Sequence, residues 1–217
     1  MLNELLKRYP CLESTREDIL KAEKALITAF KNGNKLLMCG NGGSCADCEH
    51  IAGELMKGFL SKRPLSEEQK AEMKANCPEI EEKYLSLLQR AVPAIALPSF
   101  TALNTAFCND VEPELVFAQC LMGLGKKDDV LLCISTSGNS KNVVAAALTA
   151  KALGIKTIGL TGKAGGKLKS ICDICVCVPE TETFKLQELH LPVYHYLCAR
   201  VEEEIFYTRC AADSLKH

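Results

Sequence analysis

The apolar residues of the chain fall into short runs that are separated by longer amphipathic stretches. Five runs have the length of a β-strand: residues 35–40 (KLLMCG), 93–98 (PAIALP), 129–135 (DVLLCIS), 156–161 (KTIGLT) and 174–179 (ICVCVP). These runs do not alternate between apolar and polar side chains, which is typical of strands that are covered on both faces. The pattern therefore predicts five largely buried strands.

The stretches between these runs have the apolar spacing of helices. They are residues 15–31, 44–59, 139–153 and 184–207. Strands that alternate with helices predict an α/β fold, a doubly wound five-stranded parallel sheet with right-handed crossovers and helices on its faces. We expect the strand order 2-1-3-4-5, in which the first and third strands are neighbours.

Residues 61–90 interrupt this alternation with a charged, helical segment. Ser66 followed by Gln69 predicts a capping box. Pro78 predicts a break between two helices, because proline lacks the amide that a helix interior needs. We interpret 61–90 as a helical insertion between the first and second strands, and a lid, a subunit contact and an ordinary surface segment all remain open.

Length and composition limit the possible functions. A chain of 217 residues is enough for one domain, and a net charge of −1 provides no basic field for DNA or RNA. The first ten residues, MLNELLKRYP, do not have the pattern of a secretory signal, and no apolar run has the length of a membrane span. We therefore expect a soluble cytoplasmic protein whose 13 cysteines are free thiols.

Two polar loops follow predicted strands and open predicted helices. The first is residues 40–44 (GNGGS), in which the amides of Gly42, Gly43 and Ser44 can face an anion. The second is residues 135–140 (STSGNS), with four hydroxyls on Ser135, Thr136, Ser137 and Ser140. Either loop alone is equally well explained as an ordinary connection. Together, at neighbouring strands, they predict a site for a phosphate monoester.

Acid-base and metal-binding side chains occur on two of the predicted helices. His50 and Glu54 are four residues apart and share one helix face, although such a pair is often only a surface ion pair. Gln187 and His195 are about two turns apart on the last helix, so both can face the same crevice. His190 points elsewhere, and we interpret it as a structural or subunit-contact residue.

Two Cys-x-x-Cys pairs raise the alternative of a structural zinc site. The pairs are Cys45 with Cys48 and Cys172 with Cys175. We disfavour this alternative because Cys175, together with Cys177, belongs to a predicted strand and is expected in the core.

Several motifs resemble those of a known family. They are CGNGGS (39–44), the segment from His50 to Glu54, AFCND (106–110), DDVLLCISTSGNSKNV (128–143), GIKTIGLTGKAGGKL (154–168) and LQELHLPVYH (186–195). Together they resemble the sugar isomerase (SIS) domain proteins, and within them the phosphoheptose isomerases. The 61–90 insertion, the Cys45 to Cys48 region and Pro192 depart from the family pattern.

The resemblance implies an aldose-ketose isomerase that converts sedoheptulose 7-phosphate into D-glycero-D-manno-heptose 7-phosphate through an enediolate. It implies a single SIS domain over residues 1–217, assembled as a homotetramer. Phosphate-binding serines correspond to Ser44, Ser135, Ser137 and Ser140, with Thr136 between them. Asn109 and Asp110 correspond to positions near the sugar.

The resemblance also implies an acid-base pair and a zinc site. Glu54 and His195 correspond to the acid-base pair. The zinc ligands correspond to His50, Glu54, Gln187 and His195. A non-catalytic sugar-phosphate sensor or assembly factor of the same fold is the alternative, but a pure binding protein would not need this set. The enzyme is therefore the favoured interpretation.

Overall fold

A five-stranded parallel sheet forms the centre of the protein, and the structure, a computed structural model, describes residues 1–207. Its strands are β1 (Leu36–Cys39), β2 (Ala94–Ala96), β3 (Val130–Ser135), β4 (Lys156–Thr161) and β5 (Ile174–Cys177). They are arranged in the order β2-β1-β3-β4-β5, and every neighbouring pair is parallel. The predicted fold class and strand order are confirmed.

The central strands are buried on both faces, as expected, whereas the edge strand β5 is not. All residues of β1 and β3 are buried. In β5, Ile174 and Val176 are buried but Cys175 and Cys177 are only half-buried. The prediction that these two cysteines are core residues was therefore wrong, because an edge strand turns alternate side chains toward a less covered face.

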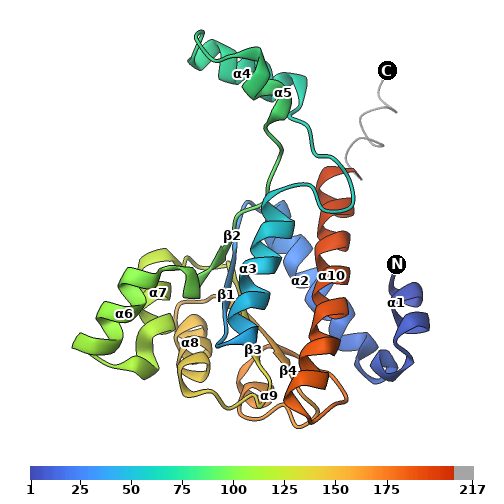
Figure 1. Cartoon of the computed structure of the whole chain (residues 1–217), viewed down its shortest axis with the longest axis vertical. Coiled ribbons are helices and arrows are strands. Elements are labelled where there is room, and N and C mark those ends of the chain that lie inside the picture. Colours follow the sequence, from blue (N-terminus) through green and yellow to red (C-terminus); the bar gives the residue numbers. More distant parts are fainter. Residues whose placement is uncertain (208–217) are drawn as a thin grey trace.

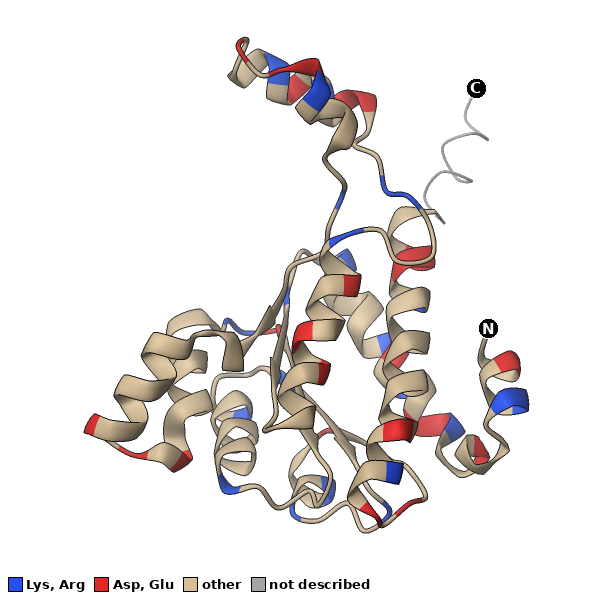
Figure 2. Ribbon diagram, viewed as in Figure 1, with Lys and Arg blue, Asp and Glu red and all other residues tan. Residues whose placement is uncertain are grey.

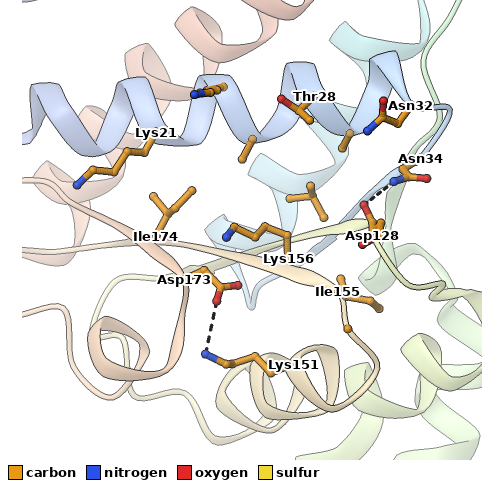
Figure 3. Close-up of a pocket in the computed structure, with 15 residues that line it drawn as sticks. Lys21, Thr28, Asn32, Asn34, Asp128, Lys151, Ile155, Lys156, Asp173 and Ile174 are labelled. Carbon is orange, nitrogen blue, oxygen red and sulfur yellow. Dashed lines mark hydrogen bonds and ion pairs between the residues drawn. The ribbon is translucent and has the colours of Figure 1, made fainter.

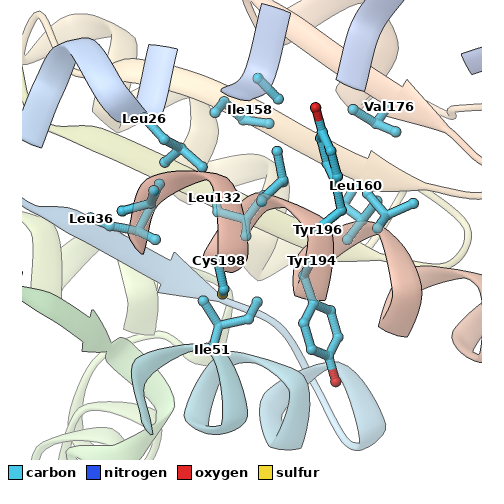
Figure 4. Packing of buried hydrophobic residues seen from close by; sticks show 14 of the residues in the cluster. Leu26, Leu36, Ile51, Leu132, Ile158, Leu160, Val176, Tyr194, Tyr196 and Cys198 are labelled. Carbon is cyan, nitrogen blue, oxygen red and sulfur yellow. The ribbon is translucent and has the colours of Figure 1, made fainter. Parts of the chain in front are cut away.

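Two layers of helices cover the sheet (Figure 1). One layer contains α1 (Leu2–Arg8), α2 (Arg16–Lys31), α3 (Gly43–Met56) and α10 (Thr183–Phe206). The other contains α6 (Thr101–Asp110), α7 (Val116–Leu124), α8 (Lys141–Ala152) and α9 (Leu168–Ile171). Figure 4 shows the core under the first layer, where Leu26 of α2, Ile51 of α3 and Cys198 of α10 pack over the sheet.

The sequence pattern did not predict α1, α6, α7 or α9. No residue of α6 is buried within the described chain, so α6 has no apolar stripe for the pattern to detect. Short 3-10 helices connect several elements: η1 (Pro10–Thr15), η2 (Leu97–Ser99) and η3 (Pro113–Leu115). α10 continues through Pro192, which removes one backbone hydrogen bond from its interior.

Residues 66–88, hereafter the arm, project away from the body (Figure 1). The arm contains α4 (Glu67–Asn76) and α5 (Glu82–Leu87). The predicted capping box between Ser66 and Gln69 is present, and the break between the two helices contains Pro78. None of the residues of α4 is buried against any part of the described chain.

Charged residues of both signs are distributed over the body and the arm (Figure 2). Within residues 1–207, no helix combines the length and the apolar character that crossing a membrane requires.

Candidate active site

The two polar loops converge at the carboxyl ends of β1 and β3. The two strands are paired, with Cys39 opposite Cys133. The side-chain amides of Asn41 and Asn142 form two reciprocal hydrogen bonds of 2.9 Å each, which join the first loop to the start of α8. The loops thus lie together at the sheet edge where doubly wound folds bind ligands.

The serine-rich loop, residues 135–140, holds its hydroxyls in a compact turn. The Oγ atoms of Ser135 and Ser140 are 3.0 Å apart, and Ser137 Oγ accepts a hydrogen bond of 3.1 Å from the amide of Asn139. The amide of Gly162 donates to the carbonyl of Thr136 at 3.0 Å, so the loop after β4 supports this turn. Ser44, in the first turn of α3, is buried.

Gly138 allows the serine-rich loop to pack closely against the loop after β4. Its φ angle is +65°, in the left-handed region that favours glycine. A Cβ atom on Gly138 would lie 2.0 Å from the carbonyl oxygen of Gly165. Any side chain at this position would push the two loops apart.

Helices α3 and α10 lie side by side and run in the same direction (Figure 1). One stripe of α3 faces α10 at the helical spacing of four, three and four residues: Gly43, Asp47, His50 and Glu54. At Gly43 the side chain of Gln187 from α10 lies against α3, since a Cβ atom there would lie 2.3 Å from Gln187 Nε2. This stripe leads from the polar loops toward the acid-base residues.

His50 is the centre of a hydrogen-bonded chain between the two helices. Its Nε2 lies 3.2 Å from Glu54 Oε1, and its Nδ1 lies 3.0 Å from the hydroxyl of Tyr194. The Tyr194 hydroxyl donates to Asp47 Oδ1 at 3.3 Å, and Lys57 Nζ donates to Glu54 Oε2 at 3.1 Å. Burial raises the pKa of Asp47, and contacts with Tyr194 and His50 oppose this shift.

Sequence reasoning missed both Asp47 and Tyr194. Asp47 lies three residues before His50, so helical spacing alone could have indicated it. Tyr194 had no comparable signal, because its hydroxyl meets His50 only through the packing of two helices.

His195 is enclosed by three aromatic rings. The ring centroids of His50, Tyr194 and Phe59 lie 5.1, 5.0 and 5.5 Å from that of His195. Its Nε2 is buried and has no hydrogen-bond partner among residues 1–207. Burial and the nearby His50 lower the pKa of His195, while Glu54 opposes them. A neutral imidazole is therefore favoured near neutral pH.

The four predicted zinc ligands do not meet at one point. Gln187 and His195 both belong to α10. The Gln187 side chain lies beside Gly43 at the start of α3, whereas His195 is eight residues further along α10, about 12 Å along the helix axis. That both side chains face one crevice stays a prediction. Throughout the described part of the chain, no three His, Cys, Asp or Glu side chains are arranged to hold a metal ion.

Asn109 and Asp110 lie away from these groups, at the exposed end of α6. Asn109 Nδ2 donates to Asp110 Oδ1 at 2.8 Å. Neither side chain hydrogen-bonds to the serine-rich loop or to α3 in the region that the structure describes. An ion pair of 2.5 Å between Glu114 and Lys141 connects the segment after α6 to the start of α8.

His190 and the cysteine pairs lie outside the site. His190 is completely buried, which excludes the predicted alternative of a subunit contact. Cys48 belongs to the core on the α3 face of the sheet, whereas Cys172 packs against the core on the opposite face. The two Cys-x-x-Cys pairs therefore cannot form one four-cysteine zinc site.

A large cavity, of about 780 Å³, lies at the amino ends of the strands, whereas the polar loops lie at their carboxyl ends. It is bounded by α2 and by the amino ends of β3, β4 and β5, and Figure 3 shows Lys21, Lys156 and Asp173 around it. A smaller groove of about 470 Å³ lies between α1 and α10 and includes His195, Phe59 and Leu60. Cavity size therefore does not mark the acid-base site, whereas the convergence of polar groups does.

Comparisons with known proteins agree with this fold. The family model described as the SIS domain matches residues 2–96 and 75–162. A phosphoheptose isomerase of a Nitratiruptor species is 41% identical over 204 residues, which cover 92% of this chain and 95% of the relative. One from Helicobacter pylori is 40% identical over 92% of this chain and 89% of its own length.

Solved structures are similar over nearly the whole chain. A phosphoheptose isomerase from Francisella tularensis has a TM-score of 0.74 and 31% identity, covering 90% of this chain and 91% of its own. One from Neisseria gonorrhoeae has a TM-score of 0.73 and 29% identity, covering 93% and 94%.

Proposed function

Because the chain belongs to the SIS domain family, and within it to the phosphoheptose isomerases, we propose that it converts sedoheptulose 7-phosphate into D-glycero-D-manno-heptose 7-phosphate. This aldose-ketose isomerisation moves a proton between two adjacent carbons through an enediolate. The observation that carries the proposal is the parallel packing of α3 and α10. It connects the hydroxyl-rich loops at one end with Glu54 and His195 further along.

The length of α3 supports a long phosphorylated sugar as the substrate. Ser44 and Glu54 are ten residues apart, about 15 Å along the helix axis, and the Glu54 side chain tilts back toward the amino end. A 7-phosphate has its phosphate and its reacting carbons at opposite ends of an extended chain. A three-carbon sugar phosphate would be too short to reach both ends of this site.

The protein groups divide the reaction between them. Amides of the first loop and hydroxyls of residues 135–140 hold the phosphate. Glu54, whose two oxygens contact His50 and Lys57, removes the carbon-bound proton and returns it to the adjacent carbon. His195, which its lowered pKa keeps neutral, exchanges protons with the two sugar oxygens.

Zinc is proposed as a cofactor on the basis of the resemblance. Imidazole and carboxylate donors suit zinc, and the buried Nε2 of His195, which lacks a partner among residues 1–207, is the observation that favours a ligand there. The resemblance assigns the ion to His50, Glu54, Gln187 and His195, which the described part of the chain does not bring together at one metal site. Bound zinc would polarise the substrate carbonyl. Because the four side chains do not converge in this chain, no step above depends on the metal.

We also propose a cytoplasmic homotetramer, as the resemblance implies. The groove beside His195 and α1 is a surface that a second copy of the chain could cover. Sedimentation velocity of the purified protein tests the assembly state.

The direct test is incubation of the purified protein with sedoheptulose 7-phosphate, with and without a chelator, while aldose formation is followed. We expect turnover, and its loss on chelation would support zinc. Glu54→Gln is expected to lower kcat by about 10²- to 10⁴-fold, because it removes the general base. Glu49→Gln on the same helix is the matched control, since Glu49 is exposed and contacts Ser99.

Absence of turnover under both conditions contradicts the proposal. Binding of sedoheptulose 7-phosphate without turnover would instead support the non-catalytic sugar-phosphate sensor.

A further inference from the structure

A second polar cluster lies where α3 ends, and the proposed reaction does not use it directly. Arg63 and Glu202 of α10 form an ion pair, with Nε and Oε1 2.7 Å apart and side-chain exposures of 0% and 3%. Burying two charges costs free energy unless further hydrogen bonds satisfy both groups. In this cluster the further hydrogen bonds of both side chains join them to the backbone at the end of α3 and in the loop that follows it.

Arg63 holds the last turn of α3. Its Nη2 donates to the carbonyl of Glu54 at 2.9 Å, and its Nη1 donates to the carbonyl of Leu55 at 2.7 Å. The last carbonyl groups of a helix have no partner within the helix, so a buried helix end needs donors from elsewhere. Arg63 supplies these donors and thereby fixes the backbone of Glu54 itself.

Glu202 organises the loop that follows α3. Its Oε1 accepts from the amide of Phe59 at 2.8 Å, and its Oε2 accepts from the amides of Leu60 and Ser61 at 2.9 and 3.1 Å. The ring of Phe59, carried by this loop, packs against His195. His195 lies seven residues before Glu202 on α10, about two helical turns.

We propose that Arg63 and Glu202 are positioning residues that set the separation between Glu54 on α3 and His195 on α10. A continuous path of hydrogen bonds runs from the Glu54 carbonyl through Arg63 to the Glu202 carboxylate, and Glu202 belongs to the helix that carries His195. The proposal rests on the proposed isomerase function only for its catalytic readout.

The test uses Glu202→Gln and Arg63→Lys in the full-length protein. Lysine keeps the charge but cannot donate to the carboxylate and both carbonyls together. We expect kcat to fall about 10- to 100-fold, since a displacement of about 1 Å has this effect on a catalytic group. KM should change by less than about twofold, because the phosphate loops lie at the other end of α3.

Asp129→Asn is the matched control. The Asp129 carboxylate is also buried, and it accepts from the amides of Lys35 and Lys126 at 3.0 and 2.8 Å and from Lys35 Nζ at 2.6 Å. It lies at the amino end of β3, and its hydrogen-bond partners belong to the segments at Lys35 and Lys126, not to α3 or α10. This variant should lose a comparable amount of thermal stability and keep the kcat of the wild type.

Hydrogen exchange of backbone amides provides a readout that does not depend on activity. In Glu202→Gln, exchange should accelerate at residues 59–61 and also at residues 50–57, where α3 ends. Unchanged kcat in both variants, or faster exchange confined to 59–61, would overturn the positioning role. A wild-type protein without isomerase activity would refute the proposed function, while the exchange result would still decide whether this cluster holds α3.

Discussion

Tyr194 shows how a single hydroxyl organises the site. The Tyr194 hydroxyl contacts His50 Nδ1 and Asp47 Oδ1 at the same time. Among residues 1–207 it is the only hydrogen-bond partner of the Asp47 carboxylate, because Asp47 Oδ2 is buried and has no partner. Buried polar groups that lose a partner are costly. The orientation of His50, and through it of Glu54, therefore depends on this hydroxyl.

Tyr194→Phe should lower both stability and activity. Without the hydroxyl, the free energy of unfolding should fall by about 1–3 kcal/mol, and kcat should fall because His50 is no longer oriented. Urea unfolding and isomerase kinetics measure the two effects. Tyr196→Phe is the control, since its hydroxyl bonds to Glu23 away from the site. Equal kcat values in the two variants would contradict the role of Tyr194.

His190 is expected to make the protein sensitive to acid. Burial lowers the pKa of His190 to about 4 from 6.5. Between these values the unfolded chain binds the proton and the folded chain does not, so stability is complete above pH 6.5 and falls as the pH drops toward 4. The loss from this group between about pH 7.5 and 4.5 is roughly 2 to 3 kcal/mol.

His190→Leu should remove that part of the pH dependence. Urea unfolding of wild type and variant at about pH 7.5 and about pH 4.5 provides the comparison. An equal loss of stability in both proteins would show that other groups cause the acid sensitivity.

At the scale of elements, the connections after the strands decide where the hydroxyls lie. The serine-rich loop is held from outside by the loop after β4, through Gly138 and Gly165. At Gly43, the side chain of Gln187 from α10 lies beside the first turn of α3. Glycine is needed at Gly138 because the backbone of Gly165 occupies the space of a side chain, whereas at Gly43 the neighbour is the end of the Gln187 side chain.

Gly138→Ala should weaken phosphate binding by more than its loss of folding stability can explain. Gly33→Ala is the control, because Gly33 also has a positive φ angle, +78°, but no atom within 4 Å of its Cβ position. We expect Gly33→Ala to cost about 1–2 kcal/mol of stability and to leave substrate affinity unchanged. Gly138→Ala should cost more and raise KM, as thermal unfolding and isomerase kinetics would show. Equal effects of the two substitutions would contradict this explanation.

At the scale of the whole molecule, the arm is attached to the same backbone that holds the acid-base pair. The amide of Gly58 donates to Gln89 Oε1 at 2.6 Å, and the amide of Arg90 donates to the carbonyl of Arg63 at 2.7 Å. Beyond this attachment the arm exposes Tyr84 and Leu87. The body should therefore fold without the arm, provided that its attachment is kept.

Replacing residues 66–88 with a short Gly-Ser linker tests this independence. We expect the free energy of unfolding to change by no more than about 1 kcal/mol, because α4 packs none of its side chains into the described body. Urea unfolding measures stability, and sedimentation velocity shows whether the arm contributes to assembly. Loss of cooperative unfolding would contradict the prediction.

Local pattern and general topology rules were sufficient for the sheet and for the two loops. Strands buried on both faces have continuous apolar runs, and parallel strands joined by helices have few possible orders. The loops at residues 40–44 and 135–140 could be identified because each follows such a run. α6 could not be identified in this way, since it has no buried face within the described chain.

The sequence by itself determined the strands, their order and the residue types available for acid-base chemistry, because periodicity and chain connectivity are local properties. Only the tertiary structure decided that Tyr194 and Asp47 orient His50, that Gln187 lies beside Gly43 of α3, and that Arg63 is buried beneath Glu54. Those facts depend on how α3 packs against α10, which begins 140 residues later in the chain. The spacing of residues along one helix carries no information about the position of its neighbour.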